Sequence, residues 1–165
     1  MIGLDTNVLV RYIVRDEEVQ SEAATRLIES RCSPESPGFV SSIVLCELTW
    51  VLTRGYGYRR DMVGRVIRRM LSVQELRVEN AELAWRAVRL FEQGKADFAD
   101  YLIGVSNRES KAEVTYTFDR RAIESDLFKI VPLFAESVGA AMAESPAVGP
   151  VFILPQMTCI ISCRP

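Results

Sequence analysis

The chain has 165 residues, of which 48% are hydrophobic and 25% are charged, and its formal net charge is −2. These values are typical of one soluble globular domain that is long enough to bury a core. No apolar run approaches the roughly 20 residues of a membrane span, and the amino terminus lacks a signal-peptide pattern, so we expect a cytoplasmic protein with no membrane partner. The absence of histidine excludes Ser-His-Asp and Cys-His nucleophilic catalysis.

The hydrophobic pattern predicts short strands that alternate with one or two helices. In the first half of the chain, we expect a strand at residues 1–5, helices at 7–14 and 17–30, a strand at 39–41 and a helix capped by Ser41 or Ser42. In the second half, we expect helices at 60–72, 80–93 and 97–110 and strands at 75–78 and 114–118. This alternation predicts an α/β fold with a parallel sheet that is covered by helices on both faces.

Four acidic residues occupy positions along these elements where an acid is hard to explain by structure alone: Asp5, Glu47, Asp100 and Asp119. Two of them lie at the ends of predicted strands, one interrupts an apolar run and one lies at a predicted helix start. In a parallel sheet, ligands gather beyond the carboxyl ends of the strands. If the fold brings the four acids together, they form an oxygen-only site suited to a hard divalent cation such as Mg²⁺. Such a site is typical of phosphodiester hydrolysis by a metal-activated water.

Each acid also has a structural alternative, which the sequence leaves open. Asp5 or Thr6 can cap the helix that follows. Glu47 lies among apolar neighbours, so it must be desolvated, paired or functional, and its structural alternative is a buried pair with an arginine. Asp97 and Asp100 have the spacing of a capping box at the start of their helix.

Two further features bear on the candidate site, a threonine next to one of the acids and a group of arginines on one predicted helix. Thr117 is two residues before Asp119, on the same side of the predicted strand, so its hydroxyl can orient that acid. The predicted helix at 60–72 places three arginines opposite its apolar side: Arg65, Arg68 and Arg69. This face is either a contact surface for phosphates or an acidic partner, or a solvated helix face.

The carboxy-terminal segment differs in composition from the rest of the chain. From Val138 onward only Glu144 and Arg164 are charged, and several prolines interrupt any regular element. We therefore predict two parts, a domain at residues 1–136 and a tail at residues 137–165 that is either flexible or docked.

Four segments, taken together and in this order, resemble the PIN-domain nuclease family, and more narrowly the VapC-like toxins of type II toxin–antitoxin systems. The segments are Leu4-Asp5-Thr6-Asn7, Ser42 to Leu48, Asp97 to Ile103 and Thr117-Phe118-Asp119. The resemblance covers residues 1 to about 135. Each segment is weak by itself, and their order and spacing make the resemblance specific. The tail beyond about Glu136 is not part of the family pattern.

The resemblance implies a three-layer α/β/α domain that cleaves RNA with Mg²⁺ or Mn²⁺. By position it implies that Asp5, Glu47, Asp100 and Asp119 are the catalytic and metal-binding acids, with Asp97 as an accessory acid. It also implies that Thr6 or Asn7, together with Thr117, orients these carboxylates. The partners that it implies are an RNA substrate, a cognate antitoxin protein and a second copy of the chain in a homodimer.

Two other functions are compatible with acids at strand ends. A phosphoacceptor signalling domain would need a nearby lysine, but the three lysines (Lys95, Lys111 and Lys129) lie at none of the predicted strand ends. A catalytically silent PIN-like module that binds RNA or protein is the second alternative, and the intact set of four acids argues against it.

Overall fold

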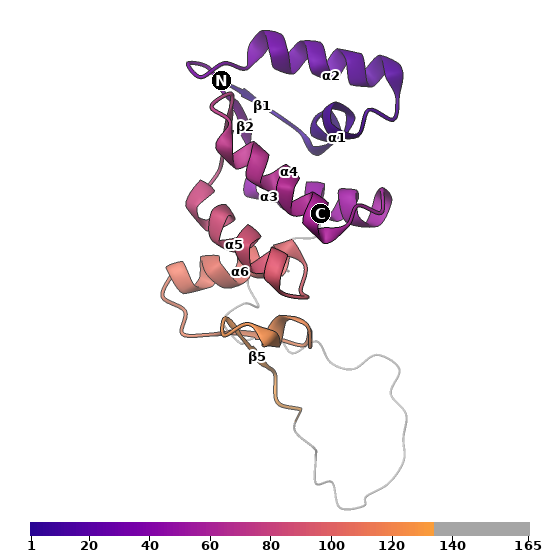
Figure 1. Cartoon of the computed structure of the whole chain (residues 1–165). Helices are drawn as coiled ribbons and strands as arrows, with labels where there is room; N and C mark the ends of the chain where they lie inside the picture. The colour runs from indigo at the N-terminus through magenta and orange to yellow at the C-terminus, as the bar shows by residue number, and fades with distance from the viewer. Residues whose placement is uncertain (134–165) are drawn as a thin grey trace, which may run out of the picture. The chain divides into compact units, whose positions relative to one another are not determined.

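The computed structural model describes residues 1–133 (Figure 1). All strand pairs in this part of the chain are parallel. Three strands form one sheet in the order β1 (Ile2–Gly3), β2 (Gly38–Val40) and β3 (Leu76–Val78). Two more strands, β4 (Thr115–Thr117) and β5 (Phe128–Ile130), form a separate two-stranded sheet. The strand pairing of β1 continues past its end, because the Leu4 amide donates to the Phe39 carbonyl at 2.9 Å. This contact fixes the backbone immediately before Asp5.

Six α-helices connect these strands: α1 (Thr6–Val14), α2 (Glu18–Arg31), α3 (Ser42–Trp50), α4 (Arg60–Ser72), α5 (Ala81–Gln93) and α6 (Phe98–Glu109). The expected helices and strands are all present with small shifts at their ends, and the predicted three-layer α/β/α class is confirmed. No helix within residues 1–133 is long and apolar enough to cross a membrane. The predicted boundary at residue 136 and the tail at 137–165 lie outside the described residues, so this division stays a prediction.

The core consists of apolar side chains from nearly every helix. Leu45, Leu48 and Leu52 are fully buried along α3 and the π-helical turn η1 (Val51–Gly55) that continues it. Helix α4 packs against α5, and α5 packs against α6, while α1 and α2 contact each other (Figure 1). Helices α1 and α6 both contact α3, so α3 connects the elements that carry the candidate acids.

The loop before α6 is held by an unusually dense set of contacts. Arg60, the first residue of α4, lies over the Phe91 ring at 4.1 Å and donates to the carbonyls of Phe91, Lys95 and Ala96. Gly94 has no Cβ, and a Cβ there would lie 1.8 Å from the Tyr101 hydroxyl oxygen. These contacts fix the backbone that leads into Asp97.

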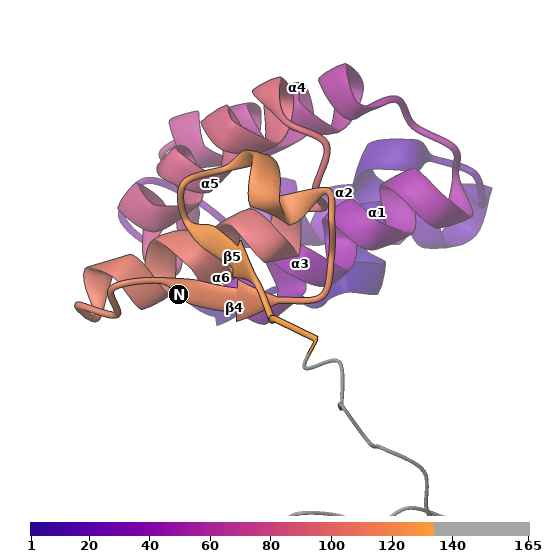
Figure 2. The same ribbon diagram turned by 90° about the horizontal axis from the view of Figure 1, so that it is seen from below.

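Strand β5 is an element that the hydrophobic pattern did not predict. It lies beside β4, and the two strands pack near α6 (Figure 2). Gly104 allows this packing, since a Cβ at that position would come within 2.8 Å of the Phe128 ring. Between the two strands the chain makes a short 3-10 helix, η2 (Ala122–Glu124).

Candidate active site

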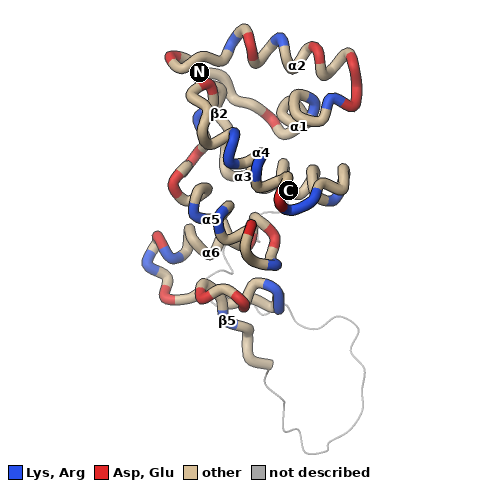
Figure 3. Tube along the Cα trace, in the orientation of Figure 1, with Lys and Arg blue, Asp and Glu red and all other residues tan. Residues whose placement is uncertain are grey.

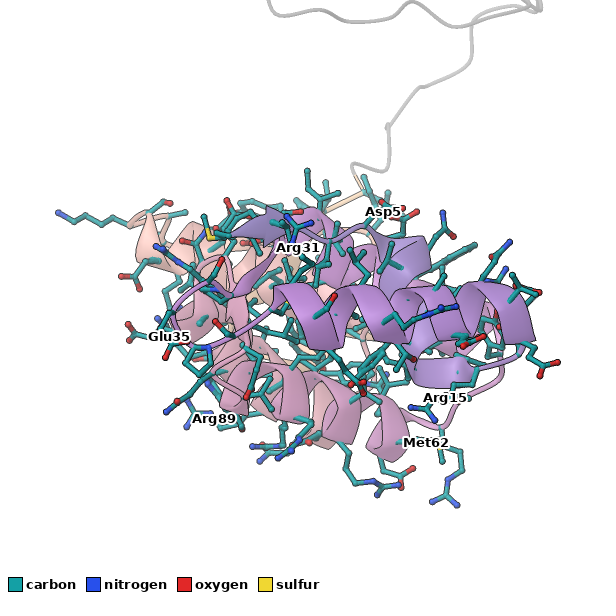
Figure 4. The ribbon with its side chains drawn as sticks, turned by 90° about the horizontal axis from the view of Figure 1, so that it is seen from above. Asp5, Arg15, Arg31, Glu35, Met62 and Arg89 are labelled. Atoms are coloured by element: carbon teal, nitrogen blue, oxygen red, sulfur yellow. The ribbon has the colours of Figure 1, made fainter. Side chains whose placement is uncertain are left out.

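Asp5 lies at the surface where β1 gives way to α1 (Figure 4). It is the N-cap of α1, and its Oδ2 accepts weak hydrogen bonds of 3.4 Å from the backbone amide and from the side-chain Nδ2 of Asn7. The capping alternative is therefore confirmed, and Asn7 contacts the acid that it was predicted to orient. An exposed cap with one free carboxylate oxygen can still bind a cation.

Thr6 and Glu47 connect the start of α1 to the middle of α3. Thr6 is buried, and its hydroxyl donates to Glu47 Oε2 at 2.5 Å. Because Thr6 directly follows Asp5, this bond places the Glu47 carboxylate close to the end of β1. Thr6 thus makes the kind of contact expected of a residue that orients a carboxylate.

The structural alternative for Glu47, a buried pair with an arginine, is wrong. Glu47 is exposed, and within residues 1–133 it has no arginine partner. The apolar run around it is not buried throughout, since Ile43 and Trp50 are 78% and 62% exposed. These residues lie four positions before and three positions after Glu47, which places all three on one face of α3. The helical period therefore carries this part of the apolar run to the surface.

Asp97 and Asp100 form the capping box that their spacing indicated. Asp97 is the N-cap of α6, and its amide donates to Asp100 Oδ2 at 3.0 Å. Asp97 also lies near two arginines, with Arg54 Nη2 at 3.8 Å and Arg121 Nη2 at 3.7 Å from its Oδ2. Both acids therefore lie in the first turn of α6, near the guanidinium groups of Arg54 and Arg121.

Asp119 lies two residues beyond β4 and is bound by Arg121. Its Oδ2 is 2.9 Å from Arg121 Nη2, and its Oδ1 accepts from the Arg121 amide at 2.8 Å. Thr117 contacts the backbone of this residue and not its carboxylate, because its Oγ1 accepts from the Asp119 amide at 3.0 Å. Thr117 therefore shapes the turn and orients the acid only through it.

Direct contacts show which acids lie together, because Arg121 contacts both Asp119 and Asp97 and the Asp97 amide donates to Asp100. Burial raises the pKa of Asp100 above its usual range, and the negative charges of Asp119 and Asp97 raise it further. The bond from Arg121 lowers the pKa of Asp119. We call Asp97, Asp100 and Asp119 the acid cluster. Helix α3 contacts α6, and burial and the charge of Asp100 raise the pKa of the Cys46 thiol, one residue before Glu47.

Two groups of candidate acids result from this geometry. The acid cluster is one, and Glu47, joined through Thr6 to the segment of Asp5, is the other. No three acidic or cysteine side chains within residues 1–133 stand ready to hold a metal ion. The donor chemistry nevertheless fits a hard cation, because all candidate ligands are carboxylates and a positive group, Arg121, already lies among them.

Arg121 and Arg54 are the residues of this site that the sequence patterns did not predict. The only sequence signal was an arginine pair, Arg120 and Arg121, directly after Asp119. Nothing in the sequence distinguishes the two arginines, and nothing there brings Arg54 to the start of α6.

The three arginines of α4 that were predicted to form a contact surface do not act alike. Arg65 pairs with Asp61 at 3.0 Å on its own helix. Arg68 makes two hydrogen bonds to Glu92 of α5 and lies 5.6 Å over the Trp85 ring, so it joins α4 to α5. Arg69 forms no ion pair within the described part of the chain. Figure 3 shows the basic positions along α4.

Arg65 and Arg69 also line a groove between α1, α2 and α4. Its volume is about 830 Å³, and its walls include Leu9, Ile28 and Met62. None of the candidate acids lines it. Figure 4 shows Met62 and Asp5 on different sides of the domain, so the groove and the Asp5 segment are separate surfaces.

Comparison with known proteins gives one family and one relative. The model of the PIN domain family matches residues 2–133. A protein from Aquifex aeolicus (strain VF5) named VapC ribonuclease is 27% identical over 134 residues, which cover 81% of this chain and 98% of that protein. No solved structure gives a significant match.

Proposed function

The chain belongs to the PIN domain family, and we propose that it is a metal-dependent endoribonuclease that acts as the toxin of a toxin–antitoxin pair. The name of the Aquifex relative supports ribonuclease activity. The observation that carries the proposal is the acid cluster, in which Asp97, Asp100 and Asp119 come from α6 and from the end of β4 and face one another. The capping box accounts for the pairing of Asp97 with Asp100, but not for Asp119, which comes from a different element and is joined to Asp97 through Arg121.

In this proposal Asp5 and Asp100 are the main ligands of Mg²⁺ or Mn²⁺, and Glu47 and Asp119 complete the site directly or through water. The bound cation supplies an activated water and stabilises charge on the phosphoryl oxygens. Thr6 holds Glu47 in place, and Asn7 does the same for Asp5. The α6 capping box fixes Asp100, with Asp97 as an accessory acid.

Substitution of single acids tests this assignment. We expect Asp5→Asn and Asp100→Asn each to reduce Mn²⁺-dependent cleavage of a single-stranded RNA by a factor of about 100 or more, because each removes a charged ligand. Asp126→Asn, a change of an exposed acid that pairs with Arg108 away from the cluster, is the matched control. Circular dichroism verifies that each variant is folded. Cleavage at the wild-type rate by folded Asp5→Asn and Asp100→Asn proteins would exclude the site and leave a silent PIN-like binding module.

We also propose that the antitoxin docks an amphipathic helix in the groove between α1, α2 and α4. The apolar walls suit its apolar side, and Arg65 and Arg69 at the rim suit acidic residues. Arg68 contributes indirectly, by joining α4 to α5. The double variant Arg65→Glu/Arg69→Glu should lose co-purification with the protein encoded immediately upstream, whereas Arg89→Glu on α5 should retain it. Equal co-purification of both variants would leave Arg65 and Arg69 as a solvated face.

The proposed homodimer concerns a different surface. Ile43 and Trp50 flank Glu47 on the same exposed face of α3. We expect Ile43→Asp/Trp50→Glu to give a monomer by analytical ultracentrifugation. A variant that sediments as wild type does would exclude this face as the contact between copies.

A further inference from the structure

The acid cluster of this chain contains a cation that belongs to the chain itself. Arg121 Nη2 lies 2.9 Å from Asp119 Oδ2 and 3.7 Å from Asp97 Oδ2. Arg121 Nε also donates to Asp119 Oδ2 at 3.2 Å. One guanidinium therefore joins the acid that follows β4 to the acid that caps α6.

Arg121 engages both oxygens of Asp119. Oδ1 accepts from the Arg121 amide at 2.8 Å and from its Nε at 3.3 Å, while Oδ2 accepts from Nε and Nη2. A divalent cation that binds Asp119 directly needs at least one of these oxygens. The metal and the guanidinium, both positively charged, therefore compete for the same two carboxylate oxygens.

The side chain of Arg121 is free to leave this position. It is 49% exposed, so its guanidinium can move into solvent without opening the core. Its backbone amide can keep its own bond to Asp119 when the side chain moves. Partly exposed ion pairs of this kind are also weak enough to be broken by a ligand.

We propose that Arg121 is an internal counter-ion of the acid cluster, which neutralises Asp119 and Asp97 in the metal-free protein and is displaced when a divalent cation binds. The inference rests on the proposed function, because it concerns the metal that this function requires. It assigns a role to a residue outside the set of acids. Because the ion pairs of Arg121 must be broken first, Arg121 weakens metal binding by the free energy of those pairs.

The experiment measures binding of Mn²⁺ alone to the full-length chain, without RNA, by isothermal titration calorimetry. Two exposed ion pairs correspond to roughly a two- to thirtyfold change in a dissociation constant, so Arg121→Ala should bind Mn²⁺ more tightly by a factor in that range. Arg121→Gln, which keeps the size of the side chain without its charge, should behave in the same way. Thermal melting with chelator and with Mn²⁺ gives a second readout, in which Arg121→Ala should gain more from the metal than wild type.

Arg120→Ala is the matched control, because it removes the same charge from the next residue. Arg120 is exposed and makes no ion pair within residues 1–133. Its effect measures how much tighter binding follows from net charge alone. An Arg121→Ala effect larger than the Arg120→Ala effect supports displacement, and an equal or opposite effect overturns it.

Failure of the inference and failure of the proposed function give different results. If wild type cleaves RNA with Mn²⁺ but Arg121→Ala and Arg120→Ala bind the metal equally, only the counter-ion role is wrong. If Arg121→Ala binds Mn²⁺ more tightly than the control but wild type cleaves no RNA, the counter-ion role holds and the nuclease assignment fails. If none of the proteins binds Mn²⁺, both are wrong.

Discussion

At the scale of single residues, the chain neutralises its own acids before any ligand arrives. Asp119 stands where repulsion from Asp100 and Asp97 would destabilise the fold, yet Arg121 binds it through the backbone and the side chain. We therefore expect Asp119→Asn to lower the stability of the metal-free protein by up to about 1 kcal/mol, the range for partly exposed ion pairs. Urea unfolding with chelator measures this change. A more stable variant would show that repulsion within the cluster exceeds the Arg121 pair.

A second residue-scale prediction concerns Asp16, which lies apart from the candidate site in the loop after α1. Its carboxylate accepts from the Tyr56 hydroxyl and from Arg11, each at 2.7 Å, and these bonds lower its pKa. A lowered folded-state pKa stabilises the protein above the unfolded pKa, and this contribution is lost as the pH falls through the folded value. Asp16→Asn should therefore lower the melting temperature at pH 7, with a difference that shrinks below about pH 4.

Tyr56→Phe is the matched variant for this test, because it removes one donor and keeps the carboxylate. It should change the melting temperature in the same direction as Asp16→Asn but by less. A difference between Asp16→Asn and wild type that stays constant from pH 7 to pH 3 would contradict the assignment.

The sequence indicated the local structural roles of the acids better than their surroundings. Asp5, Asp97 and Asp100 were each recognisable as helix caps, because a cap depends on residues within one turn. Glu47 was expected to be buried, since an apolar run by itself does not show which of its faces points outward. Arg121 and Arg54 could not be identified, because their partners are set by how α6 and η1 pack and not by local spacing.

At the scale of elements, the position of α6 depends on the loop that precedes it. Gly94 lies so close to Tyr101 that a methyl group would meet the hydroxyl oxygen at 1.8 Å. Gly94→Ala should therefore destabilise the protein by about 1–3 kcal/mol, as overpacking does elsewhere. It should also reduce RNA cleavage, because the loop leads directly to Asp97. Chemical denaturation and a cleavage assay measure the two effects.

Two variants make the Gly94 test specific. Gly55→Ala is the control, since the nearest contact of a Cβ there is an ordinary 3.8 Å. The double variant Gly94→Ala/Tyr101→Phe removes the clashing oxygen and should recover part of the lost stability. If Gly94→Ala is as stable and active as Gly55→Ala, the loop does not position α6.

Strong amphipathic patterns made the long helices predictable, and α4 begins and ends at its predicted residues. The short elements were not predictable in the same way. Strand β5 has three residues, of which only Phe128 is buried, so it shows no period from which a strand could be inferred. It forms because Gly104 leaves room for Phe128 against α6, which is a tertiary cause.

At the scale of the whole molecule, the family match ends at residue 133, and we propose that catalysis needs nothing beyond it. A chain truncated after Ser137 should fold, melt within a few degrees of the full-length protein and cleave RNA at a similar rate. Residues 138–165 have little charge and several prolines, which motivates the prediction. Loss of folding in the truncated chain would show that the apolar stretch 151–154 completes the core or a contact between copies.

The most direct test of the central claim is cleavage of a circular single-stranded RNA by the purified full-length protein, with Mn²⁺ and with chelator. A circle has no ends, so only an endonuclease opens it. We predict that wild type linearises the circle with Mn²⁺ and leaves 5′-phosphate ends, and that neither the chelated protein nor Asp100→Asn opens it. A circle that stays closed with wild type and Mn²⁺ would contradict the account. So would a circle that is opened by wild type with chelator, or by Asp100→Asn with Mn²⁺, as fast as by wild type with Mn²⁺.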